Sequence, residues 1–281
     1  MLHLREHRVD LAQPRQTPMI PEQEKQSDPF YVAVLKAALR DGAMRVDERV
    51  LVVCGGVRDE TSLREAGLRN FELSNIGGDI EVDVENLSYR DGAFDAVIVH
   101  SGLHHCASPH RGLLEMYRVA KRCIILFEPA DNMVTRLGQK LGIGQTYEFA
   151  AVQGNRLECA GWRNTSVPNW VYRFTASEIR QTVNCATPFG PHRFYFHYRT
   201  RIPWRQLHAR RNKLPLLLAA VAAPILRLLD IMGPVASNNL SAVIVKPDLP
   251  AERFPWLRQE GTGWAACRSW FESRYTYLGK L

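Results

Sequence analysis

The sequence has little of what would assign the chain to a specialised class of protein. Its six cysteines are spread along the chain and no two form a CxxC pair, so no metal site is expected. No run of five or more basic residues occurs, which leaves nucleic acid out of the expected partners. There is also no internal repeat and no low-complexity segment, so a repeat array is excluded.

The start of the chain is poor in apolar residues. Residues 1–16 have no apolar core of signal-peptide length, and residues 1–28 are polar with three prolines. We expect residues 1–28 to form a flexible leader. Cys54 and Cys123 lie in or beside apolar strand-like runs, where a reduced, buried thiol is typical. A cytoplasmic location is therefore expected.

What the sequence does contain is enough apolar residues for one sizeable core. The chain has 281 residues, of which 46% are hydrophobic and 23% charged, and its net charge is +7. This composition indicates a globular protein with one core, or one core and an elaborated lid. The positive charge favours an anionic partner such as a phosphorylated sugar or a membrane surface, although a merely solvated basic surface is an equal alternative.

Strand-like and helix-like patterns alternate from residue 29 to residue 130. Helices are predicted at residues 29–43, 59–66 and 109–120, and strands at 49–56, 70–75, 80–87, 90–105 (a turn and then a strand) and 123–130. Further strands are predicted at 192–199 and 241–247. The alternation predicts an α/β fold with a doubly wound parallel sheet, whose ligands bind beyond the carboxyl ends of the strands.

Two stretches of the sequence carry a resemblance to a known family. VLVVCGGVRDE, which begins at Val50, resembles the glycine-rich first motif of class I methyltransferases, although Cys54 and Arg58 replace two of its glycines and Val52 its acidic residue. Residues 82–121 resemble the family stretch in which an Asp follows strand three, Phe-Asp opens strand four and Leu-His-His closes it. The resemblance implies a seven-stranded Rossmann-like methyltransferase sheet over residues 29–250. Residues 131–190 and 200–240 would then be helical lid insertions on the acceptor side, and residues 251–281 a C-terminal appendage.

The resemblance also implies S-adenosylmethionine as the cofactor and places its contacts. The turn at Cys54, Gly55 and Gly56 would approach the cofactor closely, since glycine leaves room for it. The ribose hydroxyls would bind Asn75 or Asp79, the adenine amino group would bind Asp83, and the Val84 backbone would support the ring. Ser101 and Gly102 would line the methionine end.

Histidine and carboxylate side chains are candidates for the acceptor side. His105, and after it His104, is a candidate general base, because an imidazole titrates near neutral pH; the alternative is that both only pack around the pocket. Glu128 and Asp131 would bind the acceptor or be exposed loop charges. Residues 161–180 interleave aromatic residues with arginines, which suits a sugar, aromatic or phosphate group as well as ordinary packing.

An apolar stretch at residues 214–233 is not predicted to cross a membrane. Pro215 and Pro224 interrupt it, and Arg227 and Asp230 would carry charge into the bilayer. Basic residues precede it, so it is either a helical lid or a basic helix in peripheral contact with a membrane. The basic residues in question are Arg205, Arg210, Arg211 and Lys213.

The function expected from these features is methyl transfer from S-adenosylmethionine. O-methylation of a small-molecule, glycan, lipid-linked or natural-product acceptor is favoured. The alternative is a methyltransferase-like binding or assembly partner that has lost catalysis. Departures from the cofactor motif motivate it, at Val52, Cys54, Arg58 and Gly77. A nicotinamide dehydrogenase is disfavoured because CGGVRDE lacks the G-x-G-x-x-G spacing. The sequence leaves the oligomeric state open.

Overall fold

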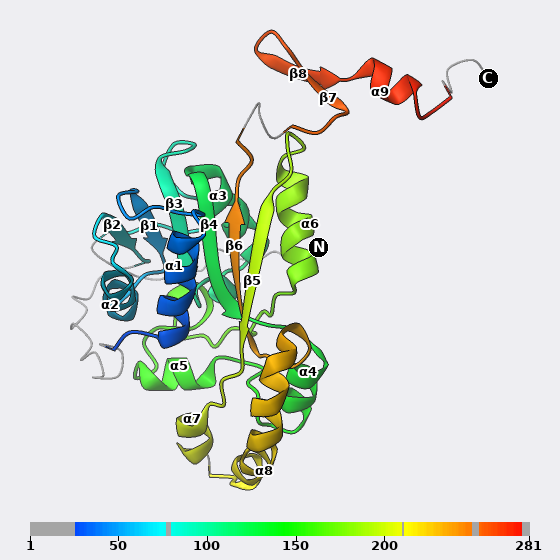
Figure 1. Cartoon of the computed structure of the whole chain (residues 1–281). Helices are drawn as coiled ribbons and strands as arrows, with labels where there is room; N and C mark the ends of the chain where they lie inside the picture. Colours follow the sequence, from blue (N-terminus) through cyan, green and yellow to red (C-terminus); the bar gives the residue numbers. More distant parts are fainter. Residues whose placement is uncertain (1–25, 77–79, 210, 249–252, 277–281) are drawn as a thin grey trace, which may run out of the picture.

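The centre of the molecule is a twisted sheet with helices on both faces (Figure 1). A computed structural model of the chain describes residues 26–76, 80–209, 211–248 and 253–276. The sheet has six strands in the order β2-β1-β3-β4-β6-β5. They are β1 (Val50–Val53), β2 (Phe71–Ser74), β3 (Phe94–His100), β4 (Ala120–Pro129), β5 (Arg193–Arg199) and β6 (Asn239–Val245). β1 to β4 run parallel, and β6 runs antiparallel to both of its neighbours.

Two pairs of helices cover the sheet. α1 (Pro29–Arg40) and α2 (Val57–Ala66) lie on one face, and α3 (Pro109–Val119) and α6 (Ala176–Ala186) on the other. Each face has its own core. Buried side chains such as Leu35 and Leu63 fill the first, and Leu113, Met116 and Ile179 fill the second. The prediction of a doubly wound α/β sheet is therefore confirmed.

Local signals fix where the helices begin and end. The Asp28 carboxylate accepts hydrogen bonds from the backbone N–H groups of Phe30 and Tyr31, which begins α1. α2 ends at Gly67, which adopts the left-handed conformation with φ of 99°. α6 begins with a capping box, in which the Thr175 and Glu178 side chains each accept a hydrogen bond from the other residue's backbone N–H.

The strand predicted at residues 80–87 does not form, so the prediction of seven strands is wrong by one. In its place Asp83 makes a turn: its carboxylate accepts from the Glu85 N–H at 2.9 Å, and its carbonyl accepts from Asn86 N–H at 2.9 Å. Arg118 of α3 then donates to the carbonyl oxygens of Leu87 and Tyr89, each at 2.8 Å. Side chains thus satisfy backbone groups that a strand would have paired with a neighbour.

The remaining elements lie at the two ends of the sheet. At the carboxyl end of the parallel strands, α4 (Met133–Lys140) and α5 (Phe149–Gly154) follow β4, and α7 (Trp204–Ala209) and α8 (Leu214–Leu229) connect β5 to β6. At the opposite end stand the hairpin β7 (Leu257–Glu260) and β8 (Gly263–Ala266) and then α9 (Arg268–Glu272). Short 3₁₀ turns occur at η2 (Leu103–His105), η3 (Trp162–Asn164) and η4 (Asp230–Val235). Within the described ranges, no helix has both the length and the apolar character needed to cross a bilayer.

Replacing Arg118 by alanine is expected to loosen residues 83–91. The change removes two hydrogen bonds to backbone carbonyls and the ion pair with Glu115, and it should lower the free energy of unfolding by about 2 kcal/mol. Urea unfolding and amide hydrogen exchange across this segment measure the effect. Arg64→Ala, which breaks an exposed pair with Glu60 and a cation–π contact with Phe71 but no hydrogen bond from the side chain to a backbone carbonyl, is the control; equal losses in the two variants would contradict the role given to Arg118.

Candidate functional site

The turn after β1 is narrow and ends at the start of α2. Cys54 adopts the left-handed conformation with φ of 55°. A Cβ placed on Gly55 would lie 3.1 Å from Val52 Cγ1, so that position is tightly packed. Gly56 is the N-cap of α2, and its N–H donates to Asp59 Oδ2 at 2.8 Å. The turn thus brings backbone and a helix N-terminus to the edge of the sheet, where polar groups of a ligand can bind.

Cys54 packs directly against the loop that follows β3. A Cβ placed on Gly102 would lie 2.5 Å from Cys54 Cβ, so the cysteine side chain occupies space that only a glycine at 102 leaves free. Ser101, one position earlier, is also left-handed, with φ of 56°. Burial and the nearby Glu128 carboxylate raise the pKa of the Cys54 thiol to about 12. The thiol is therefore protonated at neutral pH, and it contributes shape and not reactivity.

Glu128, at the end of β4, holds this loop in place. The carboxylate is 2% exposed and accepts hydrogen bonds from the backbone N–H groups of Gly102 at 3.0 Å and Leu103 at 2.7 Å. His104 Nδ1 lies 2.7 Å from its other oxygen. Glu128 is thus not an exposed loop charge. Asp131, its companion in the sequence analysis, instead pairs with Arg136.

The two histidines predicted as general bases belong to the 3₁₀ turn η2, within the loop that follows β3. His104 is buried, with Nδ1 on Glu128 and Nε2 3.7 Å from Glu148. Burial alone would lower its pKa, but the charge and hydrogen bond of Glu128 together with the charge of Glu148 outweigh burial, and the pKa is raised. His105 Nδ1 lies 2.9 Å from Asn169 Oδ1, and burial together with the His104 charge lowers its pKa to about 4. Their role as bases stays a prediction.

The predicted adenine side is covered by a segment far along the chain. Asp83 pairs with Arg163 at 2.7 Å, and Asn164 Nδ2 donates to the Ile76 carbonyl at 2.8 Å. Val84 is buried against Leu103 and Gly112. Arg163 and Asn164 therefore contact both the Asp83 turn and the start of the loop after β2.

The predicted ribose side is described only in part. Asn75 follows β2, and its Nδ2 donates to the Gly55 carbonyl at 3.5 Å. This contact places the Asn75 amide beside the glycine turn. Asp79 lies outside the described residues, and its role stays a prediction.

A cavity of about 500 Å³ opens beside the glycine turn, at the carboxyl edge of the sheet. Its lining comes from the start of α1, the first turn of α2, the ends of β3, β4 and β5, and α8. Of the predicted site residues it includes Ser101 and Glu128, but neither His104 nor His105. The cavity-lining residues that the sequence analysis did not assign to the site include Asp28, His100, Arg199, Arg201, Trp204 and Leu226.

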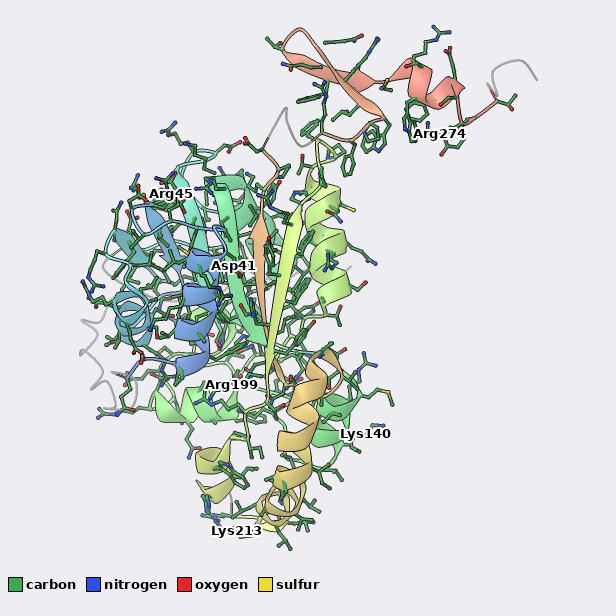
Figure 2. All side chains as sticks on the ribbon, in the orientation of Figure 1. Asp41, Arg45, Lys140, Arg199, Lys213 and Arg274 are labelled. Carbon is green, nitrogen blue, oxygen red and sulfur yellow. The ribbon has the colours of Figure 1, made fainter. Side chains whose placement is uncertain are left out.

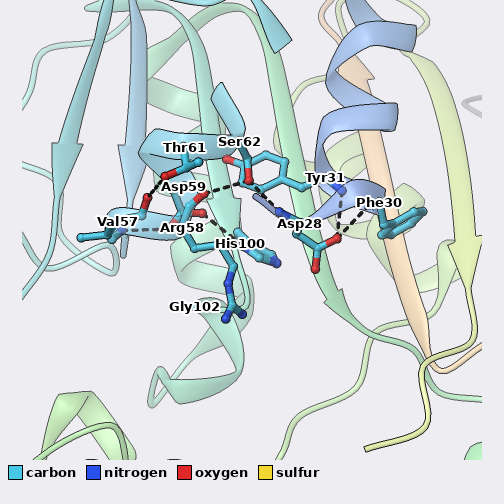
Figure 3. Close-up of polar contacts among 12 residues, drawn as sticks. Asp28, Phe30, Tyr31, Val57, Arg58, Asp59, Thr61, Ser62, His100 and Gly102 are labelled. Atoms are coloured by element: carbon cyan, nitrogen blue, oxygen red, sulfur yellow. Dashed lines mark hydrogen bonds and ion pairs between the residues drawn. The ribbon is translucent and has the colours of Figure 1, made fainter. Parts of the chain in front are cut away.

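His100 has buried partners on two helices, and Figure 3 shows it beside Asp59 and Arg58 of α2. Its Nδ1 lies 3.1 Å from Asp59 Oδ1, and Asp59 is buried in the first turn of α2. Tyr31 of α1 packs on the ring, with the two ring centroids 4.8 Å apart. The signal that could have found His100 was its position as the last residue of a buried strand, where ligand-binding residues gather in parallel sheets.

Basic and acidic groups meet at one side of the cavity. Arg199 is the last residue of β5, and Arg201 stands two positions later. Their guanidinium groups lie 3.8 and 3.9 Å from the Asp28 carboxylate. Backbone N–H groups that donate to Asp28 and the nearby cations offset the effect of its burial, so the pKa of Asp28 is lowered. Arg58 also lines the cavity, beside His100.

These features define an α/β protein that binds a ligand at the carboxyl ends of parallel strands, across a glycine turn that leads into a helix. Residues 53–126 match the family model described as a methyltransferase domain. This match agrees with the resemblance of residues 82–121 to class I methyltransferases, and it indicates S-adenosylmethionine-dependent methyl transfer for this part of the chain. Its cofactor is S-adenosylmethionine, and the close-packed turn at Gly55 with the helix N-terminus at Gly56 fits that group.

Several solved structures are similar to this chain at low sequence identity. An S-adenosylmethionine-dependent methyltransferase from Archaeoglobus fulgidus is 14% identical, with 76% of this chain and 94% of that chain covered and a TM-score of 0.43. The YcgJ protein of Bacillus subtilis is 12% identical over 79% and 100% of the two chains, with a TM-score of 0.44. A methyltransferase from Methanosarcina mazei is 14% identical over 74% and 96%, with a TM-score of 0.40. The comparison with curated protein sequences found no match.

Asp83→Ala is expected to abolish S-adenosylmethionine binding. In the predicted site the Asp83 carboxylate would accept a hydrogen bond from the exocyclic amine of adenine, and alanine cannot accept that bond. Isothermal titration calorimetry with S-adenosylmethionine measures the effect. Asp47→Ala, which removes an exposed carboxylate on the far side of the domain, is the control. An Asp83→Ala protein that binds as tightly as the parent would show that the adenine lies elsewhere.

His105 is expected to make the protein less stable as the pH falls. Its folded pKa of about 4 lies below the unfolded value of 6.5, so the unfolded state takes up the proton first and stability falls from pH 6.5 to pH 4. The contribution is at most about 3 kcal/mol. Urea unfolding at pH 7 and pH 4.5 should show a smaller loss in His105→Asn than in the parent. Equal losses would mean that His105 is not held neutral.

Proposed function

We propose that the protein transfers the methyl group to a hydroxyl of a small-molecule, glycan or natural-product acceptor that binds in the cavity beside the glycine turn. The observation that carries the proposal is that His100 lines the cavity from the end of β3 and is held from behind by Asp59, a buried carboxylate at the start of α2. A hydroxyl is a poor nucleophile until a base takes its proton, and an imidazole held by a carboxylate is suited to that task.

The contacts of His100 give it a defined role in this reaction. With Nδ1–H donating to Asp59 Oδ1, the lone pair lies on Nε2, at the other side of the ring. Asp59 is itself fixed, because its second oxygen accepts from the Gly56 N–H. His100 Nε2 would take the hydroxyl proton while the acceptor oxygen attacks the methyl carbon. Asp59 would stabilise the imidazolium that forms and would hold the ring in orientation.

The cofactor would be held by residues on both sides of the glycine turn. When bound, S-adenosylmethionine supplies an electrophilic methyl group on a sulfonium. Asp83 would bind the adenine, and the Gly55–Gly56 turn with Ser101 would line the methionine end. Arg58, in the first turn of α2, would pair with the methionine carboxylate. A cation at this position then complements the cofactor, although the sequence motif has a glycine there.

Arg199 and Arg201 support an acceptor that carries an anionic group. Both guanidinium groups line the cavity, and each lies nearly 4 Å from Asp28, so neither makes a close bidentate pair with that carboxylate. A phosphate or carboxylate of the acceptor would satisfy them better, since arginine binds both in bidentate fashion.

In the described ranges the cysteines form no disulfide, which supports the proposed cytoplasmic location.

His100→Asn is expected to lower turnover about 100-fold and to leave the affinity for S-adenosylmethionine within about threefold, because it removes the base and not the cofactor contacts. Turnover is measured as S-adenosylhomocysteine release over a panel of hydroxylated acceptors with and without a phosphate or carboxylate. His110→Asn is the matched control, since His110 pairs with Glu178 outside the cavity lining.

Three outcomes would each count against one part of this proposal. Full turnover by His100→Asn would remove His100 as the base. Cofactor binding by the parent without turnover on any acceptor would favour the alternative, a binding or assembly partner that keeps the cofactor site. Preference for acceptors without an anionic group would argue against the role of Arg199 and Arg201.

A further inference from the structure

The outer face of α8 is apolar and exposed. Leu214, Leu217, Val221 and Ile225 follow at a spacing that places them on one side of a helix, and each is between 58% and 69% exposed. The opposite side, with Ala219 and Ala223, is buried. In water a helix of this kind normally shows charged side chains on its outer face.

A second exposed apolar face lies at the same end of the molecule. Met133, Leu137 and Leu141, in and just after α4, are 81%, 55% and 44% exposed. α4 and α8 both lie beyond the carboxyl ends of the parallel strands (Figure 1). Together these seven side chains form what we call the apolar end face.

Positive charge borders the apolar end face. Residues 133–141 and 211–226 contain four basic residues and no Asp or Glu. Arg136 pairs with Asp131, which leaves Lys140, Arg211 and Lys213 as the cations beside the face. Figure 2 shows Lys140 and Lys213 at this end of the molecule. Apolar side chains bordered by lysine and arginine are the pattern of helices that lie in the surface of an anionic bilayer.

We propose that the apolar end face docks on a membrane surface that contains anionic lipids. α8 has 16 residues, which is shorter than the roughly 20 residues that span a bilayer. It would therefore lie along the surface, with Leu217 and Val221 among the acyl chains and Lys213 at the level of the phosphates. The acyl chains of the bilayer would cover the apolar side chains, and the anionic headgroups would pair with the cations that border them.

This docking would bring the cavity close to the lipid. Trp204 of α7 and Leu226 of α8 line the cavity. The insertion between β5 and β6, which carries the α8 part of the apolar end face, therefore also forms one wall of the proposed acceptor site. An acceptor with a lipid anchor, or one dissolved in the bilayer, would then reach the cavity from the membrane side. This consequence rests on the proposed function, whereas the docking itself does not.

Co-sedimentation of the full chain with vesicles tests the docking. The parent is expected to bind vesicles of phosphatidylcholine with about one-third phosphatidylglycerol, and to bind pure phosphatidylcholine about tenfold or more weakly. The double variant Leu217→Glu/Val221→Glu should lose about tenfold or more of its binding to the anionic vesicles, because both side chains would have to enter the acyl layer. Val46→Glu, a charge placed on an exposed apolar residue between α1 and β1, should bind as the parent does.

A second variant and two further measurements keep the outcomes distinct. Arg211→Glu/Lys213→Glu leaves the apolar residues intact and should weaken binding only to anionic vesicles. Circular dichroism melting and calorimetry with S-adenosylmethionine show whether each variant is folded, independently of any acceptor. Absence of vesicle binding by the parent, or equal binding by Leu217→Glu/Val221→Glu, would overturn the proposal. So would a dimer in solution that this variant dissociates, because a second copy would then cover the face.

Discussion

The loop that follows β3 depends on the buried carboxylate of Glu128. A carboxylate that leaves water is stable only if donors replace the solvent, and Gly102, Leu103 and His104 provide three. These hydrogen bonds bring Gly102 against Cys54 and aim His100 and Ser101 at the cavity edge. The glycine turn after β1, the loop after β3 and the cavity therefore share one structural support at the end of β4.

Backbone strain gathers at the same place. Cys54 and Ser101, each directly after a parallel strand, adopt φ near 55°, a conformation that costs a residue with a side chain about 1–2 kcal/mol. The two turns are neighbours because β1 and β3 are neighbours in the sheet. Cysteine at position 54 is tolerated because position 102 has no side chain. The departure from the glycine motif is thus balanced by a residue 48 positions away in the sequence.

Most of the fold could be predicted from the sequence because its signals are local. In α3 the spacing of Leu113, Met116 and Tyr117 predicted the buried face that the structure has. The strand predicted at residues 80–87 does not form, for a reason that periodicity does not contain. Val82 and Val84 alternate as in a strand, but the Glu85 carboxylate accepts from the N–H groups of Ala107 and Ser108, and the Leu87 carbonyl accepts from Arg118.

The site was predictable only where the family pattern is dense. The glycine turn and the loop after β3 lie where the motifs implied. His100 lies at a strand end where ligands are expected, but it was given no role because its partner, Asp59, is 41 positions earlier and neither residue is unusual in its own segment. Arg58 was taken as a defect of the motif, whereas in space it lines the cavity with His100. Glu128 was assigned to the acceptor, or to solvent, because burial at the end of a strand cannot be read from a single acidic letter.

The helices between β5 and β6 show how one insertion meets two demands. The inner side of α8 carries small residues, Ala219 and Ala223, which let it pack closely on the body, and its neighbour Leu226 reaches the cavity. A helix that served only as a lid could carry Lys or Glu on its outer side, since these residues favour a helix as much as leucine does. Leucine, valine and isoleucine on this outer side do not stabilise the protein while they are exposed to water, and the β-branched valine and isoleucine also lower helix propensity. The outer face of α8 is therefore explained by a second apolar surface, and the proposed docking supplies that surface beside the cavity.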